Sequence, residues 1–169
     1  MGNRNFCIKI SVISLVFGLM VVGVTGAQTD NRLNGSWFLH EDGTVLEYRF
    51  TNGDYEVVIN GLLMERGTYT TNNNVLYMNP THLHGAFGAL LVELFGKSSA
   101  FESRWYTKNE FIIIIMPIFS EIGLSEIQIN EIVSELVSTE TFTYPYSVDN
   151  NTIVLTKLDD KSVVILTRK

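Results

Sequence analysis

The sequence predicts a mainly β domain with helices: an antiparallel up-and-down barrel of about eight strands, with a helical insertion between strands five and six. Three observations predict this fold class. Short segments near both ends of the mature chain alternate apolar and polar residues, turn dipeptides separate these segments, and the stretch between them has apolar residues at helical spacing. Strands joined mostly by hairpins favour a barrel, because closure removes the exposed edges of an open sheet.

The first 27 residues are typical of a secretory signal peptide. Two basic residues precede an apolar run over 10–24, and Thr25 and Ala27 are small residues at the positions that signal peptidase reads. As a helix, the run of about 15 residues extends about 22 Å, which is less than a hydrocarbon core of about 30 Å. An uncleaved anchor is the alternative. We expect cleavage after Ala27, a single mature domain of 28–169 without stable membrane insertion, and a secreted or periplasmic location.

Charge and cysteine content narrow the classes of function. The chain has a formal net charge of −6, and loss of the two basic residues of the signal peptide makes the mature chain more acidic. Nucleic acid is excluded as a partner, because phosphate backbones are bound by clustered Lys and Arg, which are scattered here. The single cysteine, Cys7, lies in the signal peptide. The mature chain therefore has no disulfide and no thiol nucleophile, and a packed core must stabilise it.

Eight strands follow from the hairpin turns. Asp42-Gly43, Asn52-Gly53 and Asn60-Gly61 each separate two apolar segments, and both residues of such a pair adopt the positive φ that a type I′ turn requires. A looser turn is expected at 71–75. The first five strands lie near 36–40, 45–50, 54–60, 62–71 and 75–79. The last three are "FTYPYSV", "TIVLTKL" and "SVVILTRK", which Asn- and Asp-rich turns separate.

The insertion at 81–138 begins with a predicted helix. Apolar residues from 83 to 95 recur at helical spacing, Thr81 can cap the start, and Gly96 can end it. This helix is apolar around most of its circumference, which is typical of a buried helix.

Two capping boxes mark further elements of the insertion. Ser125 with Gln128 opens an amphipathic helix, and the sequence "TKNE" at 107–110 opens the apolar run 111–116. Consecutive apolar residues suit either a helix or a buried strand, so this run stays open between the two. Pro117 is expected to end it in either case.

The segment "LNGSW", which contains Gly35 and Trp37, resembles the Gly-x-Trp signature at the first strand of lipocalins and of bacterial secreted lipocalin-like domains. The resemblance covers 33–80 and 140–169. It implies that Trp37 lies under the closed end of the barrel and that an arginine near the end of the last strand packs across its ring. Arg168 has the required position, and such a cation–π contact contributes about 0.5–2 kcal/mol. Gly35, Trp37 and Arg168 are therefore expected to be structural.

The sequence also departs from the classical lipocalins. It has no counterpart of their Thr-Asp-x-Tyr loop motif, and they lack a long helical insertion between strands five and six. The expectation is therefore lipocalin-like geometry. The alternative for Trp37 is a large aromatic side chain that plugs a small β domain of another kind.

Aromatic residues in the predicted strands are the candidate ligand-binding residues. If several face inwards, the barrel encloses an apolar space with hydroxyls at intervals, as in a small-molecule cavity. The alternative is a filled core, since eight-stranded barrels are just wide enough for their own side chains. Two arginines are candidate anchors for an anionic headgroup. The full set is Tyr48, Phe50, Tyr69, Tyr77, Tyr144, Tyr146, Arg66 and Arg104.

The sequence predicts no catalytic residue, no metal site and no cofactor. His82 and His84 are the only paired imidazoles, but a helix start at Thr81 would turn their side chains apart, and a zinc site needs a third ligand. Asp159-Asp160 and Glu41-Asp42 fall in predicted turns, where Asp bonds to nearby backbone. No serine lies in a Gly-x-Ser-x-Gly turn.

Two functions follow. The first is a secreted or periplasmic lipocalin-like binding protein for a small hydrophobic ligand of the fatty acid or lipid class, with part of 81–138 as a helical lid. It predicts an unfilled apolar cavity. The second is a non-enzymatic protein–protein interaction or inhibitor module with a filled barrel, which predicts an exposed apolar patch on the insertion.

Overall fold

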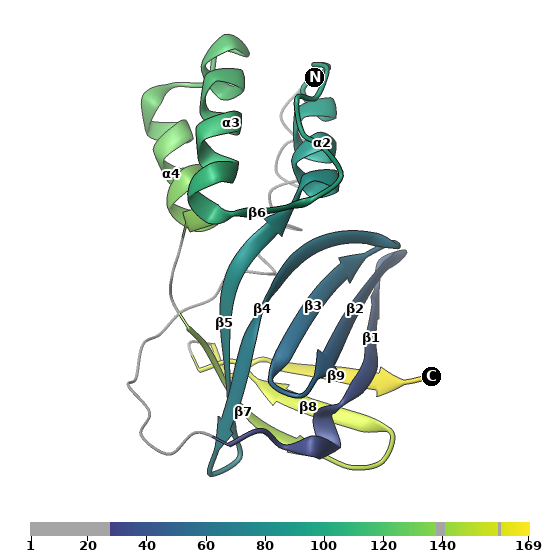
Figure 1. Cartoon of the computed structure of the whole chain (residues 1–169). Coiled ribbons are helices and arrows are strands. Elements are labelled where there is room, and N and C mark those ends of the chain that lie inside the picture. The colour runs from purple at the N-terminus through teal and green to yellow at the C-terminus, as the bar shows by residue number, and fades with distance from the viewer. Residues whose placement is uncertain (1–27, 138–140, 159) are drawn as a thin grey trace.

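The computed structural model describes residues 28–137, 141–158 and 160–169. A barrel of antiparallel strands forms one part of the molecule, and three helices stand together at one end of it (Figure 1). The strands are β1 (Gly35–Glu41), β2 (Thr44–Thr51), β3 (Asp54–Ile59), β4 (Leu62–Asn72), β5 (Val75–His84), β6 (Trp105–Thr107), β7 (Phe142–Val148), β8 (Thr152–Thr156) and β9 (Val163–Arg168). The helices are η1 (Asn31–Leu33), a single 3₁₀ turn, and α2 (Gly85–Glu93), α3 (Lys108–Glu121) and α4 (Glu126–Val137).

Eight strands close the barrel, so the predicted fold class is confirmed. The sheet runs β4-β3-β2-β1-β9-β8-β7-β5, and a further pairing of β4 with β5 completes the circle. The remaining strand, β6, pairs only with the far end of β5, beyond the barrel. Together with α2, α3 and α4, it forms the insertion between the fifth and sixth barrel strands.

The hairpins have the backbone that their dipeptides predict. Asp42, Asn52 and Asn60 have φ of 46°, 50° and 49°, and the glycine after each also has positive φ. The turn from β4 to β5 differs from the expected looser loop: Asn73 and Asn74 form a tight pair with φ of 49° and 59°. Asparagine adopts the left-handed region more readily than other side chains, so two asparagines replace the usual Asn-Gly here.

Trp37 plugs the closed end of the barrel. Its side chain is fully buried, and its Nε1–H donates a hydrogen bond of 2.6 Å to the carbonyl oxygen of Leu33 in η1. The Arg168 guanidinium lies 4.3 Å from the indole centroid and donates to the carbonyl oxygens of Arg32 and Asn34. The expected cation–π contact is therefore present, and Gly35 beside it has a φ of 122° that favours glycine.

The first helix of the insertion begins later than predicted. Residues 81–84 continue β5, because Leu83 pairs with Glu65 of β4 and with Tyr106 of β6. The helix α2 therefore starts at Gly85, and His84 rather than Thr81 caps it by accepting a hydrogen bond from the Ala86 N–H. Gly96 does follow the helix end, with φ of 70°.

Segment 111–116, for which the sequence allowed either a helix or a buried strand, is helical. The expectation that Pro117 ends this segment was wrong. The helix α3 runs through Pro117 to Glu121. A proline at this position removes the bond to the Ile113 carbonyl, but Ile113 lies on the solvent face with 73% exposure, where water can satisfy that oxygen. The Thr107–Glu110 capping box starts the helix as predicted. The box of Ser125 with Gln128 also forms, ahead of α4.

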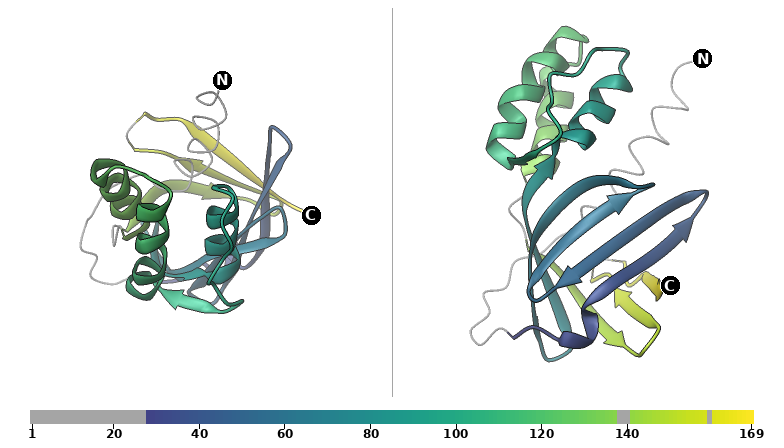
Figure 2. Two further views of the ribbon diagram at one scale, coloured as in Figure 1. Left: turned by 90° about the horizontal axis from the view of Figure 1, so that it is seen from above. Right: turned by 45° about the vertical axis from the view of Figure 1, so that its right-hand side comes forward.

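The helices have a core of their own. It is formed by Met64, Leu83, Phe87, Leu91, Tyr106, Phe111, Ile115, Phe119, Ile129 and Leu136. Because Met64 and Leu83 belong to β4 and β5, this core rests on the extended hairpin of these strands. Two further views show the helices standing over the β4–β5 side of the barrel, away from the edge where β1 and β9 meet (Figure 2).

Candidate functional site

The barrel wall is incomplete where β1 meets β9. The two strands pair only at Trp37–Arg168 and Phe38–Thr167. In the same register, His40 would face Ile165, but no pairing continues past Phe38. Each strand stays bonded to its hairpin partner, β1 to β2 along its whole length and β9 to β8 over five residue pairs. The natural twist of the two hairpins then separates their ends. We call this opening the seam.

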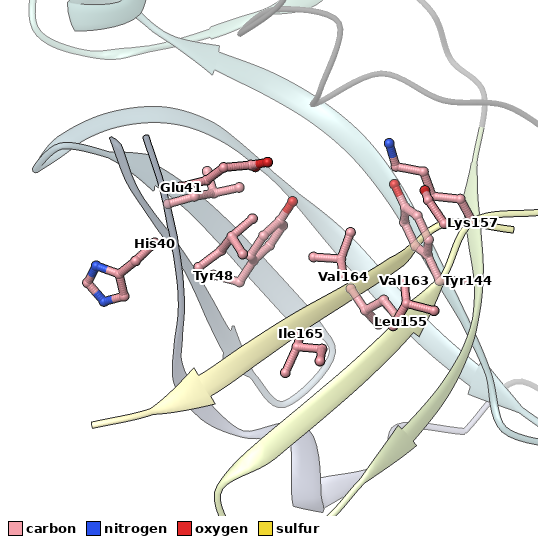
Figure 3. A pocket seen from close by; sticks show the side chains of 12 residues that line it. His40, Glu41, Tyr48, Tyr144, Leu155, Lys157, Val163, Val164 and Ile165 are labelled. Carbon is pink, nitrogen blue, oxygen red and sulfur yellow. The ribbon is translucent and has the colours of Figure 1, made fainter. Parts of the chain in front are cut away.

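A cavity of about 480 Å³ occupies the seam and reaches into the barrel. This volume lies within the range of about 300–1,000 Å³ that is usual for small-molecule sites. Both strand edges and the inner faces of the neighbouring strands line it (Figure 3). The lining residues are Leu39, His40, Glu41, Leu46, Tyr48, Tyr144, Leu155, Lys157, Ser162, Val163, Val164 and Ile165.

The inner wall of the cavity is apolar with two phenol groups. Leu39, Leu46, Leu155 and Val164 belong to or pack against the barrel core, and Tyr48 and Tyr144 approach from different hairpins. In Figure 3 the hydroxyls of both tyrosines and the Lys157 ammonium point toward the same side of the cavity, while the His40 ring turns away from it. Such a site suits an apolar molecule with a small polar group.

The other candidate tyrosines and Phe50 lie elsewhere. Phe50, Tyr69 and Tyr146 are buried in the packed core near the closed end. Tyr146 also donates a hydrogen bond of 2.7 Å to Asp30. Tyr77 lies between the inward residues Leu76 and Met78, so it points out of the barrel. The interior is therefore filled near Trp37 and hollow at the seam, a combination of the two alternatives.

The two candidate arginines stack on aromatic rings outside the barrel. The Arg66 guanidinium lies 4.9 Å from the Trp105 ring centroid, and that of Arg104 lies 3.8 Å from Tyr106. Arg66 alternates with the inward residues Glu65 and Gly67 and pairs with His82 on the outer face. Neither arginine lines the seam cavity.

Glu65 places a carboxyl group inside the barrel and is not among the residues predicted from the sequence. Its side chain is only 3% exposed, and the Tyr55 hydroxyl donates a hydrogen bond of 2.8 Å to its Oε1. Burial raises the pKa of Glu65 to about 7, against the lowering effects of the Tyr55 bond and the Lys108 charge. Strand alternation could have indicated this orientation. Gly67 and Glu65 lie two and four positions before Tyr69 in β4, and residues at this spacing face the same side of a strand.

Gly67 makes room for the contact between Tyr55 and Glu65. It pairs with Tyr55 across β3 and β4. A methyl group at Gly67 would lie 2.8 Å from the Tyr55 ring and would clash with the Asn79 carbonyl oxygen. The absent side chain lets the phenol lie flat over β4 and reach the carboxyl group of Glu65.

His82 and His84 are on an extended strand, so the expected divergence of their side chains was wrong. They share one face of β5. His84 caps α2 and packs edge-on against Trp105, and the His82 Nδ1 lies 2.9 Å from the Thr81 hydroxyl. Within the described part of the chain, no three His, Cys, Asp or Glu side chains are placed to hold a metal ion.

Among residues 28–137, 141–158 and 160–169, no helix has both the length and the hydropathy of a transmembrane span. Comparisons of the chain with protein-family models, with curated proteins and with solved structures find no match. The geometry of the barrel and its seam therefore carries the functional argument.

Proposed function

We propose that this protein is a lipocalin-like binding protein that holds a small hydrophobic ligand, of the fatty acid or lipid class, in the seam cavity. The observation that supports this most is the cavity of about 480 Å³ between β1 and β9, which adjoins the hydrophobic core of the barrel. A filled core offers no such volume. The contact of Arg168 with Trp37 supports the lipocalin-like part of the proposal.

The driving force for binding is burial of apolar surface. The leucines and Val164 of the cavity wall remove an aliphatic chain from water, which is favourable by about 25 cal/mol per Å² of apolar area. The polar group of the ligand stays near Tyr48, Tyr144 and Lys157. The strand edges of the seam give the ligand a lateral route into the barrel.

The helical insertion has a different role in this proposal from the expected lid. None of the described residues that line the cavity belongs to 81–137. The helices instead extend the β4–β5 side, and their contacts with Met64 and Leu83 hold them there. The cavity is thus open to solvent at the seam without any movement of the helices.

The proposal includes cleavage after Ala27 and a secreted or periplasmic location. Gln28 exchanges two backbone hydrogen bonds with Thr71. A mature chain that begins at Gln28 keeps this connection to the barrel.

Native mass spectrometry of the mature chain, purified from its own cells without detergent, tests the proposal. We expect a stoichiometric adduct of lipid size, which organic extraction then identifies. Val164→Trp fills the inner wall and should abolish the adduct, whereas Tyr77→Trp, on the outer face of β5, should retain it. A protein that stays free of ligand when single-chain lipids are added would refute the proposal.

A protein–protein interaction module is the second candidate function. Ile113 and Ile127 on the helical insertion are 73% and 71% exposed, and a contiguous surface patch of such apolar side chains marks a protein-binding site. The test is whether one stoichiometric partner copurifies with the wild type and is lost in Ile113→Ser with Ile127→Ser. If Val164→Trp removes that partner as well, the surface of the insertion is not the binding site.

A further inference from the structure

Two polar groups inside the barrel bear on the chemistry of the ligand. The first is Oε2 of Glu65, which is buried and has no hydrogen-bond partner in the described part of the chain. The second is the hydroxyl of Tyr48, a lining residue of the seam cavity, which is not one of the fully buried unpaired atoms and can be reached from the cavity. Buried polar groups are almost always bonded, and an unpaired carboxylate oxygen is costly. Oε2 of Glu65 therefore lacks a hydrogen-bond donor, and a donor that enters from the seam can also bond to Tyr48.

The strand register brings these two groups to one level of the barrel. Tyr48 pairs with Val57, and Val57 pairs with Glu65. All three side chains face inwards from the same wall of the barrel, with the phenol of β2 and the carboxyl group of β4 on either side of Val57. They are close enough for the charge of Glu65 to raise the pKa of Tyr48.

The neighbouring groups leave one acceptor and one donor available. Tyr55 already donates to Oε1 of Glu65, so Oε2 is the remaining acceptor. Burial raises the pKa of Tyr48 well above its usual value, so this hydroxyl keeps its proton and can donate. A bridging group must accept one hydrogen bond and donate another, and a hydroxyl does both.

We propose that the ligand carries a hydroxyl group that accepts a hydrogen bond from Tyr48 and donates one to Oε2 of Glu65. This inference rests on the proposed function and deepens it: the ligand is a neutral aliphatic alcohol, whose hydroxyl passes from the seam beyond Tyr48 while its chain lies against the leucines of the cavity. Tyr48 and Glu65 are then the residues that determine specificity. Oε2 is buried and Glu65 is not a lining residue of the cavity, so binding of the hydroxyl requires a rotation of the Tyr48 side chain.

The electrostatics disfavour an anionic head group at this position. A carboxylate would face the carboxylate of Glu65, and like charges in a buried site repel strongly. An ether oxygen can accept a hydrogen bond from Tyr48, as an alcohol oxygen can. It has no O–H to donate, so an ether would leave Oε2 of Glu65 without a partner.

Binding of 1-dodecanol, 1-methoxydodecane and dodecanoic acid to the mature chain tests the inference, because these molecules share one chain length. At pH 8 the wild type should bind the alcohol about tenfold or more tightly than the ether, and more tightly than the acid. Glu65→Gln replaces the acceptor with an amide and should reduce the preference for alcohol over ether to about twofold or less. Tyr48→Phe should weaken binding of the alcohol and of the ether alike, since both accept.

Glu56→Gln is the matched control, because Glu56 is on the outer side of β3, where it lies near Arg49, and it should keep the full preference. Circular dichroism and thermal unfolding confirm that each variant is folded. If the wild type binds the ether as tightly as the alcohol, or the acid most tightly, the hydroxyl bridge is wrong and the proposed function stands. If none of the three aliphatic molecules binds, the proposed function fails and the bridge with it.

Discussion

The guanidinium of Arg168 lies 4.3 Å from the centroid of the Trp37 indole and joins the last strand to the first. These two residues are also one of only two residue pairs between β9 and β1. The contact therefore closes the barrel and fixes the base of the seam at the same time. Beyond it the two hairpins separate, and the cavity begins.

Arg168→Ala should destabilise the protein by about 1–2 kcal/mol, because it removes an exposed cation–π contact and two hydrogen bonds to backbone carbonyl oxygens. Urea unfolding followed by Trp fluorescence measures the change. Lys97→Ala, at an exposed position after α2, is the control and should change stability by less than about 0.5 kcal/mol. An Arg168→Ala variant as stable as the control would show that β8 and η1 alone hold the end of β9.

A disulfide across the seam should block uptake of ligand. Residues 28–169 contain no cysteine, so His40→Cys with Ile165→Cys introduces a single pair into a chain that begins at Gln28. If the hairpins approach in the register of Trp37 with Arg168, the oxidised variant closes, and binding should fall at least about tenfold and return after reduction. The measurement is a titration with an aliphatic ligand under both conditions.

The control for the seam disulfide is His40→Cys with Val45→Cys, because these residues already pair within the first hairpin. This crosslink leaves the seam open and should not alter binding. Full binding by the oxidised seam variant would place the route of the ligand elsewhere in the barrel.

Glu65 should make the protein less stable as the pH rises. Its pKa is about 7 in the folded protein against an ordinary value of 4.5, so the folded state holds its proton where the unfolded state has lost it. The stability contributed by this proton is present below about pH 4.5 and is lost as the pH rises through about 7, a loss on the order of 3 kcal/mol.

The pH effect is measured by comparing the wild type with Glu65→Gln between pH 5 and pH 8. Burial raises the pKa values of the neighbouring Tyr48 and Tyr55 above the ordinary value of 10, so neither hydroxyl titrates in this range. His82 and His84 have pKa values lowered by burial, and they contribute the opposite slope equally in both proteins. The difference between the two unfolding free energies therefore isolates Glu65. Parallel pH profiles would mean that Glu65 is ionised throughout this range.

Pro117→Ala should stabilise the protein, because alanine restores a helical hydrogen bond to the Ile113 carbonyl at an exposed position of α3. The expected gain in the free energy of unfolding is about 1–3 kcal/mol. It is smaller than the full penalty of a proline inside a helix, because water already bonds to the Ile113 carbonyl oxygen. Chemical unfolding measures the change, with Ser120→Ala as a control in the same helix. A loss of stability would mean that the proline ring makes a packing contact that alanine cannot replace.

The sequence by itself determined the local features of this protein. Asp42-Gly43, Asn52-Gly53 and Asn60-Gly61 predicted the hairpins, because positive φ is a property of those residues and not of their surroundings. The capping boxes at Thr107 and Ser125 likewise require only residues within one turn. Even the contact of Trp37 with Arg168 followed from a short signature and the alternation of the last strand.

Only the tertiary structure decided where β5 ends and where the cavity lies. Residues 81–84 have the pattern of a helix start, but their pairing with β4 and β6 keeps them extended. The seam depends on the twist of two hairpins that are far apart in the sequence and pair at only two positions. Such properties depend on contacts between distant segments, and no local pattern of residues encodes them.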